Sequence, residues 1–154
     1  KGMPAGIGEP VFDKLDAQLS KAVMSIGATK GIEIGDGFMV AETTGSENND
    51  EFYNDNGHIA KRTNHSGGVL GGMSDGSDII FRTAIKPTPS ISSLQSTVSR
   101  NGDEMQVCIK GRHDPVIVPR AVVVVEAMTA LTLVDLIFDN MTARMDRVKE
   151  FYRK

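Results

Sequence analysis

A long apolar run from Ala121 to Phe138 limits the possible folds more than any other feature of the sequence. The run is nearly long enough to cross a membrane, so it must be buried either in lipid or inside a protein. Glu126 and Asp135 interrupt it, and each acidic side chain would be costly at the centre of a bilayer. We therefore expect a buried helix of a soluble protein.

The start of this run is ambiguous between strand and helix. Val122–Val125 is a β-branched segment, which favours a strand by propensity. The residues that follow, Glu126–Leu131, are mostly helix formers, and the whole run is longer than an ordinary strand. Pro119 stands where a first-turn proline is tolerated. The sequence thus predicts a buried C-terminal helix from Ala121 to about Met145.

Periodicity predicts the remaining elements. Apolar side chains recur at helical spacing from Pro10 to Ile26, which predicts an amphipathic helix. Thr29–Ile34 alternates apolar and polar side chains, and Phe38–Ala41 can continue on the far side of a glycine turn, which together predict a strand pair. Glu42–Ser66 is polar and aperiodic, so we expect a long exposed loop, reaching to about residue 72, outside the core. Three further strands are expected, the last two as a hairpin: Asp78–Ile85, Ile91–Ser99 and Glu104–Lys110.

Length and composition favour a single domain, and the elements predicted above make its expected class α+β, with antiparallel strands packed on long helices. A chain of 154 residues with 40% hydrophobic residues can form one core. Its formal net charge of -3 offers no field that attracts nucleic acid or an anionic membrane. Cys108 is the single cysteine, which excludes an intramolecular disulfide and fits a cytoplasmic protein. We find no signal peptide near Lys1.

The segment from Ser66 to Ser74 has the most unusual composition in the chain. Its four glycines allow backbone amides to approach a ligand closely and to adopt positive φ angles. The spacing imitates a phosphate-binding P-loop, but Met73 occupies the position of the lysine that contacts the phosphates. A nucleoside-triphosphatase loop is therefore excluded. A glycine-rich turn with a purely structural role remains the alternative.

A second candidate segment, Lys86–Ser90, directly follows a predicted strand. Its two prolines stiffen the loop and remove amide donors, and the loop presents a lysine, a threonine and a serine. Such a loop can hold a phosphate or the edge of a flavin. A simple connector between strands is the alternative.

Further candidate residues surround the start of the last helix. In Arg112-His113-Asp114 a strand-like geometry places Arg112 and Asp114 on one side, where they can act together. Arg120 opposes the helix dipole, so it faces an anionic ligand or another subunit, or else it is a solvated arginine. We expect no metal site, because the spacing of the histidines matches no usual one. These histidines are His58, His65 and His113.

Taken in order, these segments resemble the chorismate synthase family across almost the whole chain. The matching stretches are GEPVFDKLDA (8–17), AVMSI (22–26), KGIEIGDGF (30–38), GSENND (45–50), NHSGGVLGG (64–72), KPTPS (86–90), KGRHDP (110–115), PRA (119–121) and EAM (126–128). Colinear matches of this kind are far more specific than one glycine motif. The resemblance implies a C-terminal part of the β-α-β sandwich of that family.

The resemblance also implies an activity. Family members bind reduced flavin mononucleotide (FMN) and convert 5-enolpyruvylshikimate 3-phosphate to chorismate and phosphate by a 1,4-anti elimination without net redox change. A separate enzyme or an intrinsic NADPH-dependent activity reduces the flavin, and the sequence leaves both open. The resemblance further implies a cytoplasmic homotetramer, with no nucleic-acid or membrane partner.

The resemblance assigns roles to particular residues. The flavin contacts of the family correspond to Gly27, Ala28, Gly71, Lys86, Pro87, Thr88, Pro89, Ser90 and Arg112. Asp114 matches a carboxylate close to the flavin, so Asp114 and Arg112 are the candidate catalytic residues. Arg120 is the candidate for binding the substrate or another anion. Gly27 stands where other members often have asparagine, so a side-chain contact there is replaced by backbone or lost.

Several functional parts of the family have no counterpart in this sequence. They are its two catalytic histidines, an arginine-serine-serine flavin segment and the N-terminal arginines that bind the substrate. We therefore expect the parent protein to be a chorismate synthase and the isolated chain to be inactive. The alternative, from a different class, is a non-catalytic module that binds flavin or phosphate or serves only in assembly.

Overall fold

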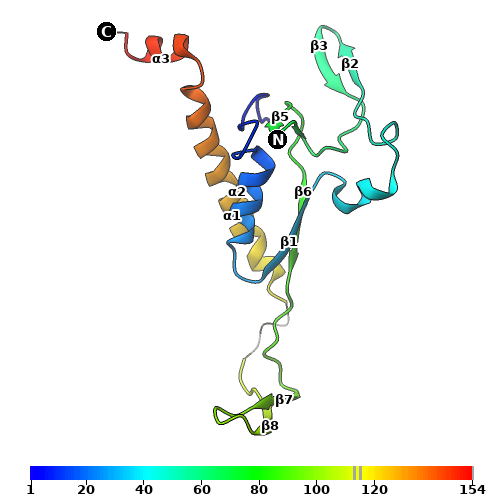
Figure 1. Cartoon of the computed structure of the whole chain (residues 1–154), viewed down its shortest axis with the longest axis vertical. Helices are drawn as coiled ribbons and strands as arrows, with labels where there is room; N and C mark the ends of the chain where they lie inside the picture. Colours follow the sequence, from blue (N-terminus) through cyan, green and yellow to red (C-terminus); the bar gives the residue numbers. More distant parts are fainter. Residues whose placement is uncertain (113, 115, 154) are drawn as a thin grey trace.

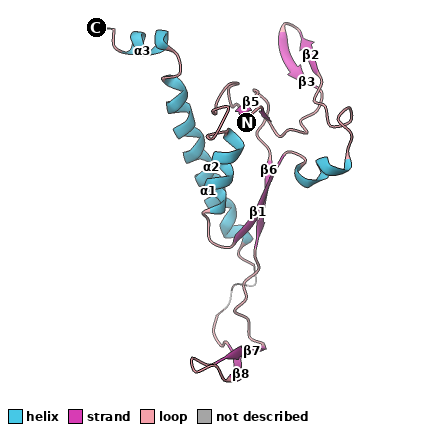
Figure 2. Ribbon diagram, viewed as in Figure 1, coloured by secondary structure: helices cyan, strands magenta, loops and turns pink. Residues whose placement is uncertain are grey.

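The computed structural model describes residues 1–112, 114 and 116–153 (Figure 1). The helices are α1 (Leu15–Met24), α2 (Val118–Met141) and α3 (Met145–Phe151), with a 3-10 helix η1 at Gly37–Glu42. The strands are β1 (Thr29–Ile34), β2 (Phe52–Asp55), β3 (His58–Lys61), β4 (Val69–Leu70), β5 (Met73–Ser74), β6 (Phe81–Ile85), β7 (Leu94–Val98) and β8 (Glu104–Cys108). They form the antiparallel pairs β1–β6, β2–β3, β4–β5 and β7–β8. Figure 2 shows this mixture of helices and strand pairs, which confirms the expected α+β class.

Helix α1 is amphipathic because Leu15, Leu19 and Val23 recur at every fourth position, and all three side chains are fully buried. The helix begins at Leu15 and not, as expected, near Pro10. The amide of Leu15 donates to the carbonyl of Gly72 over 2.7 Å, and no side chain caps the helix. The glycine turn therefore satisfies an N-terminal amide that would otherwise lack a partner.

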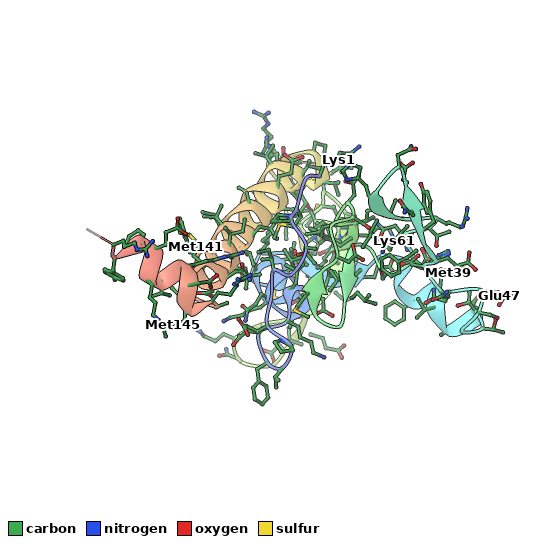
Figure 3. All side chains as sticks on the ribbon, turned by 90° about the horizontal axis from the view of Figure 1, so that it is seen from above. Lys1, Met39, Glu47, Lys61, Met141 and Met145 are labelled. Carbon is green, nitrogen blue, oxygen red and sulfur yellow. The ribbon has the colours of Figure 1, made fainter. Side chains whose placement is uncertain are left out.

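The hydrophobic core is small for a chain of this length. The accessible surface is 11406 Å², whereas a compact monomer of this length exposes about 7,600 Å². The excess, about 3,800 Å², is comparable with the area that a large obligate interface buries. Seen from above, Met39 and Glu47 lie at one outer edge and Met141 and Met145 at the other (Figure 3). The buried cluster consists of Met3, Ile7, Leu15, Leu19 and Leu136.

Helix α2 forms as expected, with Pro119 in its first turn. The expectation that α2 is buried is wrong for this chain, because Leu136 is the only buried residue that the structure describes in it. Helix α1 and the core cover one side of α2, and the side chains of Val123 and Leu131 are 65% and 66% exposed. By length and composition alone, α2 is long and apolar enough to cross a membrane.

Strand β1 pairs with β6, with Ile34 opposite Phe81, and not with the segment that follows it. The strand expected at residues 38–41 is wrong, because that segment lies in η1. Gly35 adopts a φ of 57°, which turns the chain away from β1. Its amide donates to the carbonyl of Ile80 over 2.8 Å. The distant strand β6 therefore occupies the edge that a local hairpin would have used.

The stretch from Glu42 to Ser66, expected to lack regular structure, contains the β2–β3 hairpin. Asn56 and Gly57 form its turn with φ angles of 52° and 94°. Two successive left-handed residues are what a tight hairpin turn requires, and Asn-Gly is the usual sequence for it. The signal is present in the sequence, but polar residues flank it in place of the alternating apolar residues of an ordinary hairpin.

The β7–β8 hairpin confirms the expected pair of alternating strands, with Leu94 opposite Cys108. Figure 1 shows it apart from the helices, at the end of the molecule away from the N-terminus. Most of its residues are exposed, including Cys108. Because an isolated two-stranded hairpin is marginally stable, this arm has little support from the rest of the described fold.

Candidate functional site

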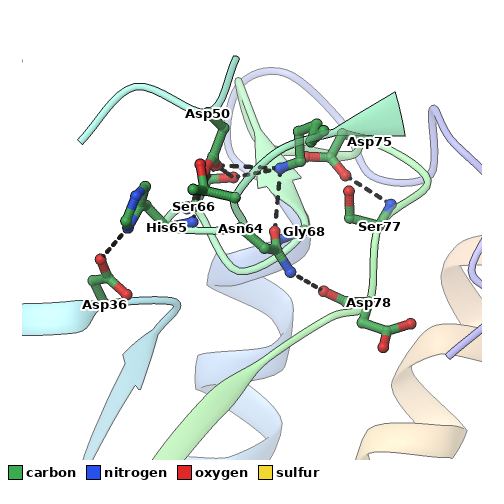
Figure 4. A network of polar contacts seen from close by, with 11 residues as sticks. Asp36, Asp50, Asn64, His65, Ser66, Gly68, Asp75, Ser77 and Asp78 are labelled. Atoms are coloured by element: carbon green, nitrogen blue, oxygen red, sulfur yellow. Dashed lines mark hydrogen bonds and ion pairs between the residues drawn. The ribbon is translucent and has the colours of Figure 1, made fainter. Parts of the chain in front are cut away.

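A buried lysine, Lys61, joins the two sides of the glycine-rich segment. Figure 4 shows the polar network around it, with Asp50, Asn64, Ser66 and Asp75 labelled. The ammonium of Lys61, with a side chain only 5% exposed, lies 3.2 Å from Asp50 Oδ2 and 2.7 Å from Asp75 Oδ2. It also lies 3.1 Å from Asn64 Oδ1 and 3.1 Å from Ser66 Oγ. We call these five residues the Lys61 clasp. A lysine has three donors, so these acceptors satisfy all of them.

Asp50 is the most densely hydrogen-bonded carboxylate in the clasp. Its oxygens accept from the backbone amides of His65 and Ser66, over 2.7 Å and 3.0 Å, and from the hydroxyl of Thr63 over 2.7 Å. Burial tends to raise the pKa of Asp50, but hydrogen bonds from Ser66, Thr63 and His65 outweigh burial and hold that pKa far below its usual range. Asp50 therefore stays ionised in the folded chain.

Asp75 completes the clasp from the other side of the glycine-rich segment. Burial again tends to raise its pKa, while the ammonium of Lys61 and hydrogen bonds from Ser77 lower the pKa below its usual value. Asn64 extends the network, because its Nδ2 donates to the carbonyl of Asp78 over 2.8 Å. His65 lies at the edge of the network, with its Nδ1 2.5 Å from Asp36 Oδ2.

The four glycines of this segment divide into two kinds. A Cβ on Gly68 would lie 2.6 Å from the carbonyl oxygen of Asp78, and one on Gly72 would lie 2.6 Å from Lys14 Cγ. Gly67 is packed equally tightly against the backbone of Gly35. Gly71, with a φ of 61°, would place a Cβ in open space. Packing therefore explains three of the glycines, and Gly71 is the one open to a ligand.

Two of the predicted flavin contacts meet at the beginning of β1. The amide of Lys86 donates to the carbonyl of Ala28 over 2.7 Å, which joins the Gly27–Ala28 turn to the Lys86–Ser90 loop. Ala28 adopts a φ of 70°, an uncommon value for a residue other than glycine. A strained backbone held by a long-range hydrogen bond is a feature that often marks a functional site.

The predicted residues before α2 are arranged differently from the expectation. Arg112 and Asp114 were expected to act together, but Asp114 Oδ2 accepts from Arg120 Nη1 over 2.6 Å. Within the described part of the chain, no ion pair joins Arg112 to Asp114, and Arg112 is exposed. The expected position of His113 lies outside the described residues. Arg120 therefore offsets a carboxylate of its own chain rather than standing unpaired.

The predicted ligand-binding residues lie at two opposite ends of the β1–β6 pair. Val118 in the first turn of α2 lines the same hollow as Ile85, so Arg120 lies near the end of β6 where the Lys86–Ser90 loop begins. Gly71 lies in the turn between β4 and β5. Figure 1 shows β5 beside the N-terminus, at the opposite end of the pair. The six residues of β1 span about 20 Å. The structure thus places the Gly27–Ala28 turn, the Lys86–Ser90 loop and the start of α2 at one end of this pair and Gly71 at the other.

Sequence reasoning missed Lys61, Asp50 and Asp75. The available signal was the position of ionisable residues on both sides of a glycine-rich segment, which suggests that a charge pair closes it. Among the residues that the structure describes, no group of three histidine, cysteine or acidic side chains is placed to hold a metal ion.

The clasp predicts how stability depends on pH. The folded pKa values of Asp50 and Asp75 lie below the unfolded value of about 3.9. Their contribution to stability is therefore complete above pH ~4 and is lost as the pH falls through the folded values. We expect urea midpoints to be level from pH 7 to about pH 5 and to fall steeply below pH ~4. Asp50→Asn should flatten that fall, and a variant that follows the wild-type curve would contradict the prediction.

Comparison with known proteins gives a consistent result. The family model described as chorismate synthase matches residues 1–138. The chain is 73% identical over 153 residues to a chorismate synthase of Lachnospira eligens, covering 99% of this chain and 42% of that protein. It is 60% identical over 136 residues to a chorismate synthase of Archaeoglobus fulgidus, covering 88% of this chain and 38% of that protein.

A solved structure described as a chorismate synthase crystal structure is also similar. It superposes with a TM-score of 0.70 and 31% identity, covering 97% of this chain and 38% of the solved chain. The chain thus spans about two fifths of the length of the relatives it matches.

Proposed function

Because this chain belongs to the chorismate synthase family, we propose that it forms the C-terminal part of an enzyme converting 5-enolpyruvylshikimate 3-phosphate to chorismate and phosphate by 1,4-anti elimination. The joint between Ala28 and Lys86 is the observation that carries this proposal. It brings together two segments that are far apart in the sequence and that both match flavin contacts of the family.

The predicted flavin contacts fit an anionic cofactor such as reduced FMN. Lys86 and Arg112 are exposed cations, and a Cβ added at Gly27 would meet no atom within 4 Å. The hydroxyl of Thr29, the residue after Ala28, is buried and has no hydrogen-bond partner in the described chain, so an unsatisfied polar group lies beside this turn. We propose that Gly27, Ala28, the Lys86–Ser90 loop and Arg112 hold one end of the flavin. Gly71 would meet a different part of the ligands.

When bound, reduced FMN would lend electron density to the substrate as its phosphate leaves. The residues of this chain would act on the developing charge. As the carbon–oxygen bond breaks, the phosphate oxygens become more negative, and Lys86, Arg112 and Arg120 are the cations available to them. Asp114 holds the guanidinium of Arg120 in one orientation through the 2.6 Å contact. Exclusion of water would strengthen each of these interactions.

We propose two kinds of partner for the exposed surface. They are the remainder of a family-length chain and the further subunits of a homotetramer. The excess area described above is about 3,800 Å² and includes the apolar outer face of α2. Glu126 and Asp135 lie on α2, which favours cover by protein over lipid. A cytoplasmic location is consistent with this assignment.

Turnover tests the proposed function. A family-length chain carrying this sequence should form chorismate and phosphate from the substrate and reduced FMN without oxygen, at about 1–1000 per second. The 154-residue chain alone should form none, because most of the site and much of the packing are absent. Chorismate absorbance and released phosphate are the readouts, and oxidised FMN is the control.

Two results would change the proposal. Turnover by the 154-residue chain would contradict the need for the rest of the family-length protein. Saturable FMN binding without turnover in the family-length protein would favour the non-catalytic flavin-binding module.

A further inference from the structure

We propose that Lys61 is a positioning residue that fixes the β4–β5 turn and thereby presents Gly71 to the ligands of the proposed site. This inference rests on the proposed function for the identity of the ligand, which is reduced FMN. The fixing of the turn stands on the geometry of the Lys61 clasp alone.

The clasp closes the base of the β4–β5 hairpin from both sides. Asn64 and Ser66 precede β4, and Asp75 follows β5, yet all three contact the same ammonium, over 3.1 Å, 3.1 Å and 2.7 Å. The amide of Asp75 donates to the carbonyl of Gly68 over 3.1 Å, which adds a backbone bond across the same base. Lys61 thus ties together the two chains that lead into and out of the turn.

The turn needs such support because its own strands are very short. Strands β4 and β5 contain two residues each, and a pair of that length is not stable alone. Gly71 and Gly72, with φ angles of 61° and 88°, connect them. Fixing glycines costs more conformational entropy than fixing other residues. The clasp at the base is therefore well placed to determine whether Gly71 has one position or many.

A second brace acts at the tip but leaves Gly71 itself unsupported. The carbonyl of Gly72 accepts from the amide of Leu15, and the amide of Ser74 donates to the carbonyl of Ile7 over 2.9 Å. These bonds attach the outgoing strand to α1 and the N-terminal segment. The incoming side, with Leu70 exposed, is held by the contacts of Asn64 and Ser66 with Lys61. Two further bonds support its base, from the amide of Ile80 to the carbonyl of Gly67 and from the amide of Gly68 to Asn64 Oδ1.

Removal of the ammonium should open the base. Lys61→Met keeps a long apolar side chain but leaves Asp50 and Asp75 as two buried carboxylates without their shared cation. Their repulsion and need for water would separate the two chains that the clasp joins. Arg62→Met is the matched control, because Arg62 is the adjacent cation but is 63% exposed and pairs with Glu51.

The experiment uses the family-length chain and two readouts. Hydrogen exchange by mass spectrometry should show peptides covering residues 64–75 exchanging at least ~10-fold faster in Lys61→Met, with α1 peptides unchanged. Titration with reduced FMN should show a dissociation constant raised about tenfold, while kcat at saturating FMN stays within about twofold. Arg62→Met should match the wild type in both. Unchanged exchange and unchanged FMN affinity in Lys61→Met would overturn the proposal.

A double variant separates positioning from general damage to the fold. In Lys61→Met/Asp75→Asn the second change removes one of the two unneutralised carboxylates, so slow exchange and FMN affinity should return in part. A double variant no better than Lys61→Met in both readouts would contradict the electrostatic account. If Lys61→Met fails to fold, Asp75→Asn alone tests the same base with a smaller change. Absence of FMN binding to the wild type would refute the proposed function, whereas the exchange rates would still decide whether Lys61 fixes the turn.

Discussion

Leu19→Ala is expected to lower the free energy of unfolding of the 154-residue chain by about 2–5 kcal/mol. The Leu19 side chain is fully buried, and it belongs to the small cluster that joins α1 to Leu136 of α2. Deleting it removes apolar burial and leaves a cavity that a sparse core can fill only partly. Urea denaturation followed by circular dichroism measures the change. Where Leu19→Ala leaves no folded baseline, Leu19→Met provides a smaller loss, below about 1.5 kcal/mol.

Leu131→Ala is the matched control for this prediction. The change in side chain is the same, but Leu131 is 66% exposed on α2. We expect a loss within about 0.5 kcal/mol. Equal losses for the two variants would show that the outer face of α2 is as well packed as α1 in the isolated chain, which would contradict the structure.

Leu131→Asp is expected to destabilise the family-length chain much more than the 154-residue chain. In the 154-residue chain an aspartate at this exposed position should be tolerated, with a change within about 0.5 kcal/mol. In a family-length chain, where we propose that protein covers the outer face of α2, the same carboxylate would be buried without a partner. The expected loss there is at least about 3 kcal/mol. Denaturation of the same variant in both chain lengths is the test, and the shorter chain is the control.

The outcome distinguishes the occupants of that face. A large loss only in the family-length chain supports cover by the rest of the protein or its subunits. A small loss in both would show that this face of α2 remains in water. Partition of the 154-residue chain into lipid vesicles, abolished by Leu131→Asp, would instead favour a membrane as the cover for the apolar face.

Local pattern predicted the existence of α1, α2 and the β7–β8 hairpin, because each depends on residues close in sequence, but it placed the start of α1 too early and did not predict α3. Leu15, Leu19 and Val23 define the buried face of α1 by spacing alone, and Pro119 marks the start of α2. The same pattern could not show what covers α2. A run of apolar residues predicts that a helix is buried, but it does not predict whether protein or lipid covers the helix.

Non-local pairing accounts for the main errors. The strand at Thr29–Ile34 was expected to pair with the segment after Gly37, and it pairs instead with Phe81–Ile85. The alternation of side chains in β1 cannot distinguish a partner strand close in sequence from a distant one, because either strand can form the same backbone hydrogen bonds with β1. Gly35 packs against Gly67, and this contact favours the pairing of β1 with β6. The contact exists only in the folded chain.

In the candidate site, too, local motifs could be predicted and long-range contacts could not. The motif at Lys86–Ser90 and the Gly27–Ala28 turn could be identified from sequence, and the structure adds that one hydrogen bond joins them. The pairing of Asp114 with Arg120, and not with Arg112, depends on how the chain enters α2. Lys61 belongs to no motif, and its burial between Asp50 and Asp75 is what distinguishes it from the other ionisable residues near the glycine-rich segment.

The β7–β8 arm also provides a practical means of following assembly. Cys108 is the only cysteine of this chain, and it is exposed on β8, apart from the helices. A thiol-reactive fluorophore would therefore label this chain at one defined position without engineering. Its emission and anisotropy would report when another polypeptide packs against the arm, and a donor–acceptor pair of labelled chains would measure how far apart two arms lie in an oligomer.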